Sequence, residues 1–266
     1  MIRYPLRNQP APFAAPRVRR ITRSAIGQVR RVLQGENEPD QWHEISGPYS
    51  LCNYPLLVSY DFSDPAQFND WELHNCDPLF LGQYPDGSRF EVAGGRLQTV
   101  LEDPMTVNTI SGECDLKASF GSPLGYMEVS AQLYNPGGAT RIGIVSNGLY
   151  FYLHWLSGYY AWESLSSGCG GTSTYPSAIV GPVAPTDGIT LTMRWCPSQV
   201  AGNGVLELEA QAPGGTSNLL ASYDEPATRP GGTRLGRCGV RWVGGHSWHV
   251  YFGQAQWDTF RVRANS

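Results

Sequence analysis

Apolar and polar residues alternate along most of the chain from residue 56 onward. In "GYMEVSAQLYN" (125–135), Met127, Val129, Ala131 and Leu133 share one face, and a period of two is that of a β-strand with one buried side. Comparable segments occur at 56–62, 70–75, 89–93, 96–102, 140–145, 149–156, 159–164, 188–196, 204–212, 219–223, 237–243, 248–253 and 255–266. Many short strands at close spacing predict an all-β protein with two antiparallel sheets packed as a sandwich.

The phase of the alternation assigns residues to two faces. The expected core comprises the four residues above together with Ile142, Ile144, Phe151, Leu153, Trp155, Leu191, Met193, Trp195, Trp248, Val250 and Phe252. The opposite face comprises Glu128, Arg141, Tyr150, Tyr152, His154, Arg194, Arg241, His249 and Tyr251. Because this second face mixes aromatic and polar groups, we expect any ligand to bind there.

Residues before the strands have a different character. Residues 1–35 contain prolines at 5, 10, 13 and 16, which favour an extended arm. Within the arm, residues 24–34 could form a short helix with Ser24 as N-cap and Gly35 past its end. Residues 36–55 form an acidic linker rich in Pro and Gly. The sandwich is therefore expected to occupy residues 56–266.

Charge is unevenly distributed between the arm and the rest. Residues 1–35 hold eight arginines and no acid, whereas the other 231 residues hold 11 basic and 23 acidic residues. Arginine suits bidentate contacts with carboxylates or phosphates. Because the body is acidic and no nucleic-acid motif accompanies the arm, we expect it to bind protein subunits of a large assembly, with nucleic acid disfavoured. The assigned arm residues are Arg17, Arg19, Arg20, Arg23, Arg30 and Arg31.

Membrane insertion and conventional secretion have no support in the sequence. No stretch approaches the roughly 20 apolar residues that span a bilayer, and the N-terminus lacks the apolar segment of a signal peptide. The six cysteines are widely spaced and lack a C-x-x-C pair, which argues against zinc. Disulfide bonds and free buried thiols both remain open.

Three groups of residues resemble one known family in order and spacing. "VSYDFSDPAQFNDWEL" is similar to the first strand of the concanavalin A-like jelly roll, in particular its laminarinase and lichenase branch. "AGGRLQTV" and "LGYMEVSAQLYN" resemble the hairpin and strand that follow, and "WDTFRVR" resembles the closing strand. The resemblance covers residues 56–263 and implies a jelly-roll β-sandwich.

The resemblance also implies site residues. The family's closing-strand acid often contributes to a structural calcium site, which makes Asp258, with Asp61 and Asp64, the candidate ligands here; no other cofactor is implied. The fold also favours glycan contact through exposed aromatic rings. The candidate residues are Tyr150, Tyr152, His154, Tyr160 and Trp162.

Catalysis is where the sequence departs from the family. Those hydrolases carry an "E-x-D-x-x-E" strand, because retaining hydrolysis needs two carboxyl groups about 5 Å apart on one face. The corresponding region here is "LYFYLHWL", which has no acid, and "WES" nearby supplies only Glu163. We therefore expect a domain without enzymatic activity.

Two functions are compatible with these features. The first is a structural protein of a virus or bacteriophage particle, assembled in the host cytoplasm, forming homo-oligomers and displaying a lectin-like sandwich as a decoration, fibre-base or adhesin domain. The alternative is an exported glycan-binding or glycan-degrading protein of the laminarinase-like class.

Overall fold

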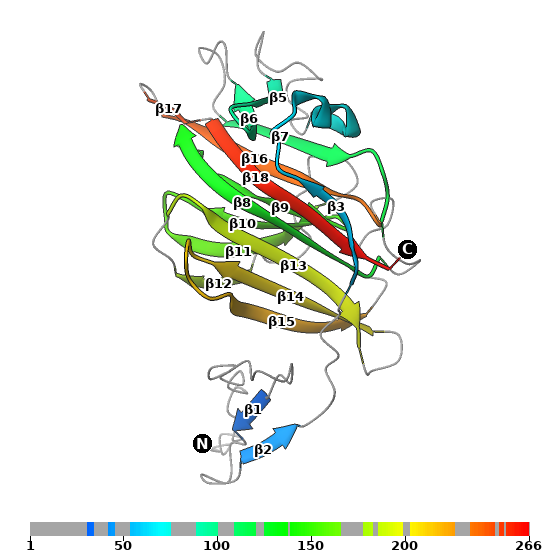
Figure 1. The fold of residues 1–266 in the computed structure, drawn as a ribbon. Coiled ribbons are helices and arrows are strands. Elements are labelled where there is room, and N and C mark those ends of the chain that lie inside the picture. The colour runs from blue at the N-terminus through cyan, green and yellow to red at the C-terminus, as the bar shows by residue number, and fades with distance from the viewer. Residues whose placement is uncertain are drawn as a thin grey trace, which may run out of the picture. The chain divides into compact units, whose positions relative to one another are not determined.

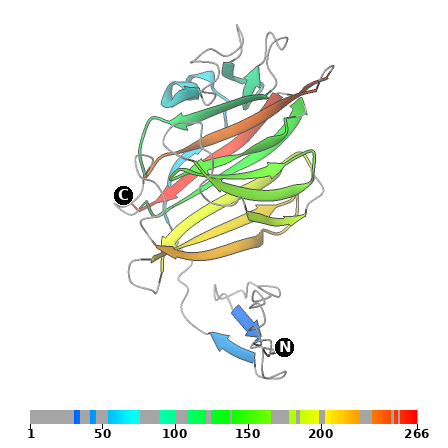
Figure 2. The same ribbon diagram turned by 180° about the vertical axis from the view of Figure 1, so that it is seen from behind.

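We describe a computed structural model of the chain for residues 31–34, 42–45, 54–75, 89–100, 109–120, 125–137, 139–165, 178–182, 186–198, 203–226, 235–247, 250–252 and 254–265. The chain divides into two compact units, Met1–Asn53 and Tyr54–Ser266. The second unit holds two antiparallel sheets of eight strands each. Both are visible in Figures 1 and 2, with the second sheet nearer the viewer in Figure 1. The all-β sandwich expected from the sequence is confirmed.

The first sheet runs in the order β12 (Ala178–Pro182), β11 (Tyr159–Ser164), β10 (Leu149–His154), β9 (Arg141–Ser146), β16 (Cys238–Ser247), β7 (Thr109–Leu116) and β4 (Trp71–Asn75), with β17 (Val250–Phe252) paired to β16. The second sheet runs in the order β15 (Asn218–Pro226), β14 (Asn203–Gln211), β13 (Ile189–Pro197), β8 (Met127–Gly137), β18 (Gln254–Ala264), β6 (Arg96–Val100) and β5 (Arg89–Ala93), with β3 (Leu56–Tyr60) paired to β18.

Two strands of the sandwich unit were not predicted. β7 contains Gly112, Glu113 and Asp115 within its eight residues, and these residue types are depleted in strands. β12 ends in Gly181 and Pro182. Local propensity therefore hides both strands, and pairing with neighbouring strands places them in the first sheet.

The N-terminal unit differs from expectation at two points. Arg31–Gln34 forms strand β1 where the end of a helix was expected, and it pairs with strand β2 (Trp42–Ile45), which lies within the expected linker. Residues 24–30 and the arginines at 17, 19, 20, 23 and 30 lie outside the described residues, as does Trp248. The second unit begins at Tyr54, two residues before the expected boundary.

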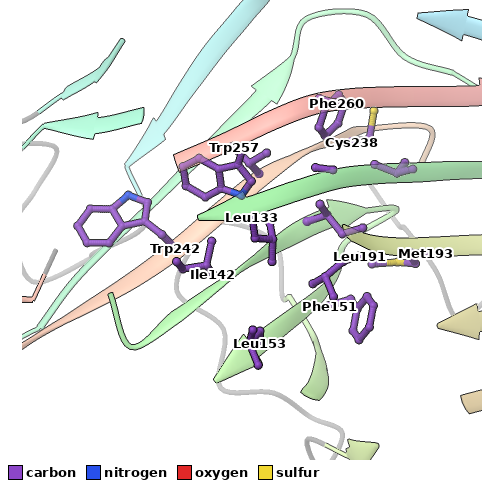
Figure 3. Packing of buried hydrophobic residues seen from close by; sticks show 14 of the residues in the cluster. Leu133, Ile142, Phe151, Leu153, Leu191, Met193, Cys238, Trp242, Trp257 and Phe260 are labelled. Carbon is purple, nitrogen blue, oxygen red and sulfur yellow. The ribbon is translucent and has the colours of Figure 1, made fainter. Parts of the chain in front are cut away.

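The core lies between the two sheets (Figure 3). Met127, Val129, Ala131 and Leu133 of β8 are fully buried, as their period of two predicts. Ile142, Ile144, Phe151, Leu153, Leu191, Met193 and Trp195 are also buried, and Trp155 packs against the core while half-buried.

One hydrogen bond joins the sheets through the core. The indole Nε1 of Trp257 on β18 donates to the backbone oxygen of Gly143 on β9, at 3.1 Å. Both groups are buried, and the bond satisfies an indole N–H that would otherwise be costly to bury. Among the described residues, no helix is long and apolar enough to cross a membrane. The one helix described in the sandwich unit is the 3-10 helix η1 (Pro65–Asp70).

Candidate functional site: the aromatic face of the first sheet

The outer face of the first sheet carries a layer of tyrosines and arginines over β9, β10, β11 and β16, which we term the aromatic face. Because Phe151 and Leu153 of β10 point into the core, the alternate residues Tyr150, Tyr152 and His154 point outward. Tyr150 and Tyr152 pack in a second cluster with Val145, Ala161 and Leu165. The sequence therefore predicted the face of these three residues correctly.

Tyr150 and Tyr152 are buried although they lie on the outer face. Their rings stack on one another with centroids 4.7 Å apart. The Tyr150 hydroxyl donates to the backbone oxygen of Arg241, at 3.2 Å. Since β9 lies between β10 and β16, this bond places the Tyr150 ring across β9. Burial raises the pKa of Tyr152 to about 12, so its hydroxyl stays protonated in neutral solution.

Two arginines lie against the tyrosine rings. The Arg141 guanidinium carbon lies 5.2 Å from the centroid of Tyr152, and that of Arg241 lies 5.4 Å from the centroid of Tyr150. Both distances are within the range of cation–π attraction. The guanidinium groups therefore help to shield the tyrosine rings from water.

The accessible part of the aromatic face lies at the ends of β10 and β11. His154 and Tyr159 are opposite each other across these strands, and their rings stack with centroids 4.6 Å apart at an interplanar angle of 25°. Both side chains are half-buried. The pKa of His154 is lowered by burial and then by the nearby positive charge of Arg141, which favours a neutral imidazole.

An ion pair flanks this stack. Arg141 Nη1 lies 3.6 Å from Glu163 Oε2, and the two side chains are 35% and 17% exposed. Guanidinium groups donate, and carboxylates accept, in directions that suit hydroxyl-bearing ligands. A ligand over the His154–Tyr159 stack would meet both a donor and an acceptor at its edge.

Two of the predicted contact residues lie elsewhere. Tyr160 and Trp162 are 6% and 7% exposed and belong to the inter-sheet core. They alternate with Tyr159, Ala161 and Glu163 along β11, so they point to the opposite side of the sheet. The structure thus brings together Tyr150, Tyr152 and His154 from the predicted set and separates them from Tyr160 and Trp162.

Strand β7 adds acidic residues that the sequence analysis missed. Glu113 lies opposite Arg241 across β7 and β16, at 3.3 Å between Oε2 and Nη1. Glu113 is fully buried and Asp115 is 2% exposed. Two acids at alternate positions share a face of a strand, and this signal was overlooked because β7 itself was not predicted.

The three candidate calcium ligands serve local structure. Asp61 Oδ1 accepts hydrogen bonds from Ser63 and Gln67, which lower its pKa to about 2. Asp64 caps η1 by accepting from Ala66 N. Asp258 accepts from the Thr259 hydroxyl at 3.2 Å. In the part of the chain that the structure describes, no group of three or more His, Cys, Asp or Glu side chains could hold a metal ion, so the calcium hypothesis lacks a ligand set there.

The three cysteines among the described residues divide into two states. Cys196 of β13 is disulfide-bonded. Cys114 and Cys238 are free and buried, and burial raises the pKa of both thiols. Both alternatives that the sequence left open are therefore present in one chain.

No protein-family model matches the chain, and the search of curated proteins finds no match. Solved structures with a similar fold include lectin UEA-II complexed with galactose (11% identity, 77% of this chain and 97% of that chain, TM-score 0.47). Another is the exoplasmic/lumenal domain of VIP36 in its Ca²⁺/Man3GlcNAc-bound form (9%, 80% and 91%, 0.46). A GH43 glycoside hydrolase engineered to display endo-xylanase and exo-arabinofuranosidase activity is a third (12%, 92% and 53%, 0.47).

None of these three structures is more than 12% identical to the chain or exceeds a TM-score of 0.47, so none assigns a family or a function to it. At such identities and TM-scores the likeness concerns the type of fold only.

Proposed function

We propose that the sandwich is a non-catalytic carbohydrate-binding domain that contacts glycans through the aromatic face. The observation that carries this proposal is the half-buried His154–Tyr159 stack beside the Arg141–Glu163 ion pair. Aromatic rings offer apolar area to the C–H face of a sugar. The ion pair offers hydrogen bonds to its hydroxyl groups.

The absence of catalysis belongs to the same proposal. The hydrolases that the sequence resembles carry their catalytic acids on one strand. The similar segment here carries Tyr150, Tyr152 and His154 instead. Glu163 is ion-paired with Arg141. Glu113 is buried against Arg241, where a substrate cannot reach it without rearrangement. A retaining mechanism needs two accessible carboxyl groups on one face.

Affinity electrophoresis in gels containing soluble galactomannan, arabinoxylan or β-1,3-glucan tests the proposal. We expect at least one polysaccharide to retard the wild-type protein. Tyr159→Ala should weaken that retardation about 10-fold, the loss expected for about 1–2 kcal/mol of stacking. Leu156→Ala is the matched control, because Leu156 lies in the turn between β10 and β11 and is 60% exposed.

Two outcomes would contradict the proposal. One is equal retardation of wild type and Tyr159→Ala in every gel that retards the protein at all. The other is release of reducing sugar that is abolished by Glu163→Gln or Glu128→Gln, which would show that the domain is an enzyme.

A second candidate function concerns the arm. Residues 1–35 carry a charge of +8 and the remainder −12, and Met1–Asn53 form a compact unit of their own. These features support a structural role in a large protein assembly, such as a virus or bacteriophage particle, with the sandwich displayed on it. Sedimentation of the native full chain with large particles, lost on deleting residues 1–35, is the expected result. Unchanged sedimentation of the deletion variant would show that residues 1–35 do not attach the protein to a large particle.

The disulfide at Cys196 bears on the alternative of an exported protein. Disulfides persist mainly in oxidising compartments. This bond supports maturation outside a reducing cytoplasm, by whichever route the chain reaches that compartment.

A further inference from the structure

A row of polar side chains crosses the outer face of the second sheet, on the other side of the sandwich from the aromatic face. Glu91 of β5 lies opposite Gln98 of β6, Gln98 lies opposite Gln256 of β18, and Gln256 lies opposite Tyr134 of β8. Their chain neighbours point into the core, so these side chains point outward. The buried neighbours are Phe90, Leu97, Trp257 and Leu133. We call Glu91, Gln98, Gln256, Tyr134 and the adjacent Arg96 the polar row.

The hydrogen bonds of the polar row all run in one direction. Arg96 Nη1 donates to Gln256 Oε1 at 2.8 Å. Gln256 Nε2 donates to Gln98 Oε1 at 3.1 Å, and Gln98 Nε2 donates to Glu91 Oε1 at 2.9 Å. A chain of aligned bonds from a cation to an anion polarises each member and strengthens the series. The side chains are thereby held in place before any ligand arrives.

Tyr134 completes the row at its β8 end. The Arg96 guanidinium carbon lies 3.5 Å from the centroid of the Tyr134 ring, which fixes both groups. All five side chains are half-buried. They are therefore ordered and still reachable by a ligand lying on the sheet.

The chemistry of the polar row selects one class of partner. Arg96 and Arg89, which pairs with Glu91 at 2.9 Å, exceed the one acid by a single positive charge, which gives little attraction for a polyanion. The row contains no aliphatic side chain for a lipid surface. The planar amide, carboxylate and guanidinium groups retain acceptor and donor positions for further hydrogen bonds. They repeat at the strand spacing of about 4.8 Å over four strands, or roughly 14 Å in all.

We propose that the polar row is a second carbohydrate-binding surface, which takes a neutral linear polysaccharide lying across β5, β6, β18 and β8. Hydroxyl groups along such a chain meet the repeating amide and carboxylate groups. The site is separate from the aromatic face, and the protein can therefore engage two glycan segments at once.

The test uses the full chain and affinity electrophoresis in glucomannan, arabinoxylan and β-1,3-glucan gels. The double variant Gln98→Ala/Gln256→Ala should bind about 10-fold more weakly than wild type, since it removes at least two hydrogen-bonding side chains. Thr192→Ala is the matched control, because Thr192 is a half-buried residue on the same face of β13. If the double variant has a lowered unfolding midpoint, Gln256→Glu replaces it in the binding test, because this change keeps the shape of the side chain.

The two carbohydrate proposals fail separately. Tyr159→Ala should leave the binding that depends on the polar row intact, and the double variant should leave the binding that depends on Tyr159 intact. The proposal of a second carbohydrate-binding surface would be overturned if the double variant and Gln256→Glu were both retarded as strongly as wild type. So would a wild-type protein that no polysaccharide gel retards.

Discussion

At the scale of single residues, side chains of one type have different surroundings. Trp257 and Trp242 are both buried in the core, 0% and 1% exposed, and lie near each other in Figure 3. Trp257 Nε1 donates to Gly143 O. Trp242 Nε1 has no hydrogen-bond partner among the described residues. The two residues form a matched pair for measuring the inter-sheet bond.

We expect Trp257→Phe to lower the free energy of unfolding by about 1–3 kcal/mol more than Trp242→Phe. Both changes remove the same atoms from the core, but only the first removes a buried hydrogen bond. Urea denaturation of the two variants measures the difference. Equal losses would mean that the Trp257 bond contributes nothing net.

His154 gives a pH-dependent prediction at the same scale. Because the folded pKa is lowered, the unfolded chain takes up a proton near pH 6.5 and the folded chain only at lower pH. In that window the unfolded state binds more protons, and stability therefore falls as pH falls. Between about pH 7 and pH 5, His154→Gln should lose less of its unfolding midpoint than wild type. A wild-type slope for His154→Gln would contradict this role.

At the scale of elements, one arginine joins three strands of the second sheet. Arg194 of β13 contacts Glu128 of β8 at 2.7 Å and Glu207 and Glu209 of β14 at 2.8 and 3.0 Å. The four side chains are 8–16% exposed. Burial by itself lowers the arginine pKa, but Glu209 and Glu128 outweigh it and the pKa is raised. Arg194 therefore stays charged and offsets three acids on adjacent strands.

Arg194→Ala should lower the free energy of unfolding by about 3–5 kcal/mol near pH 8, because it leaves buried carboxylates uncompensated. Arg89→Ala is the control, since its ion pair with Glu91 is more exposed, at 47% and 30%, and such pairs contribute about 0–1 kcal/mol. A loss no larger than that of Arg89→Ala would contradict this role of Arg194.

At the scale of the whole molecule, the start of the sandwich unit is tied to its far end. The Tyr54 hydroxyl donates to Trp195 O at 2.9 Å, and Ala264 N donates to Pro55 O at 3.2 Å. These bonds link the first residues of the unit to β13 and to the closing strand. A fragment that begins after Pro55 would therefore lose both hydrogen bonds.

A fragment of residues 54–266 keeps both of these hydrogen bonds. A fragment of residues 56–266 should be less stable by about 1–3 kcal/mol, because it lacks both bonds. Thermal and urea unfolding of the two fragments compare them directly. Equal stability of both would place the boundary after Pro55, as the sequence suggested.

The sequence by itself determined the all-β sandwich, most strand positions and the inward face of β8, β10 and β13, because a period of two in hydrophobicity is a local property that burial enforces. Only the tertiary structure decided the rest. Strand β7 was identified only from its pairing with β16, and this pairing places Glu113 beside Arg241. Register, rather than proximity in the chain, brought Arg141 to Glu163 and lined up Glu91, Gln98, Gln256 and Tyr134. Which residues are neighbours across a sheet depends on the strand order, and no local pattern encodes that order.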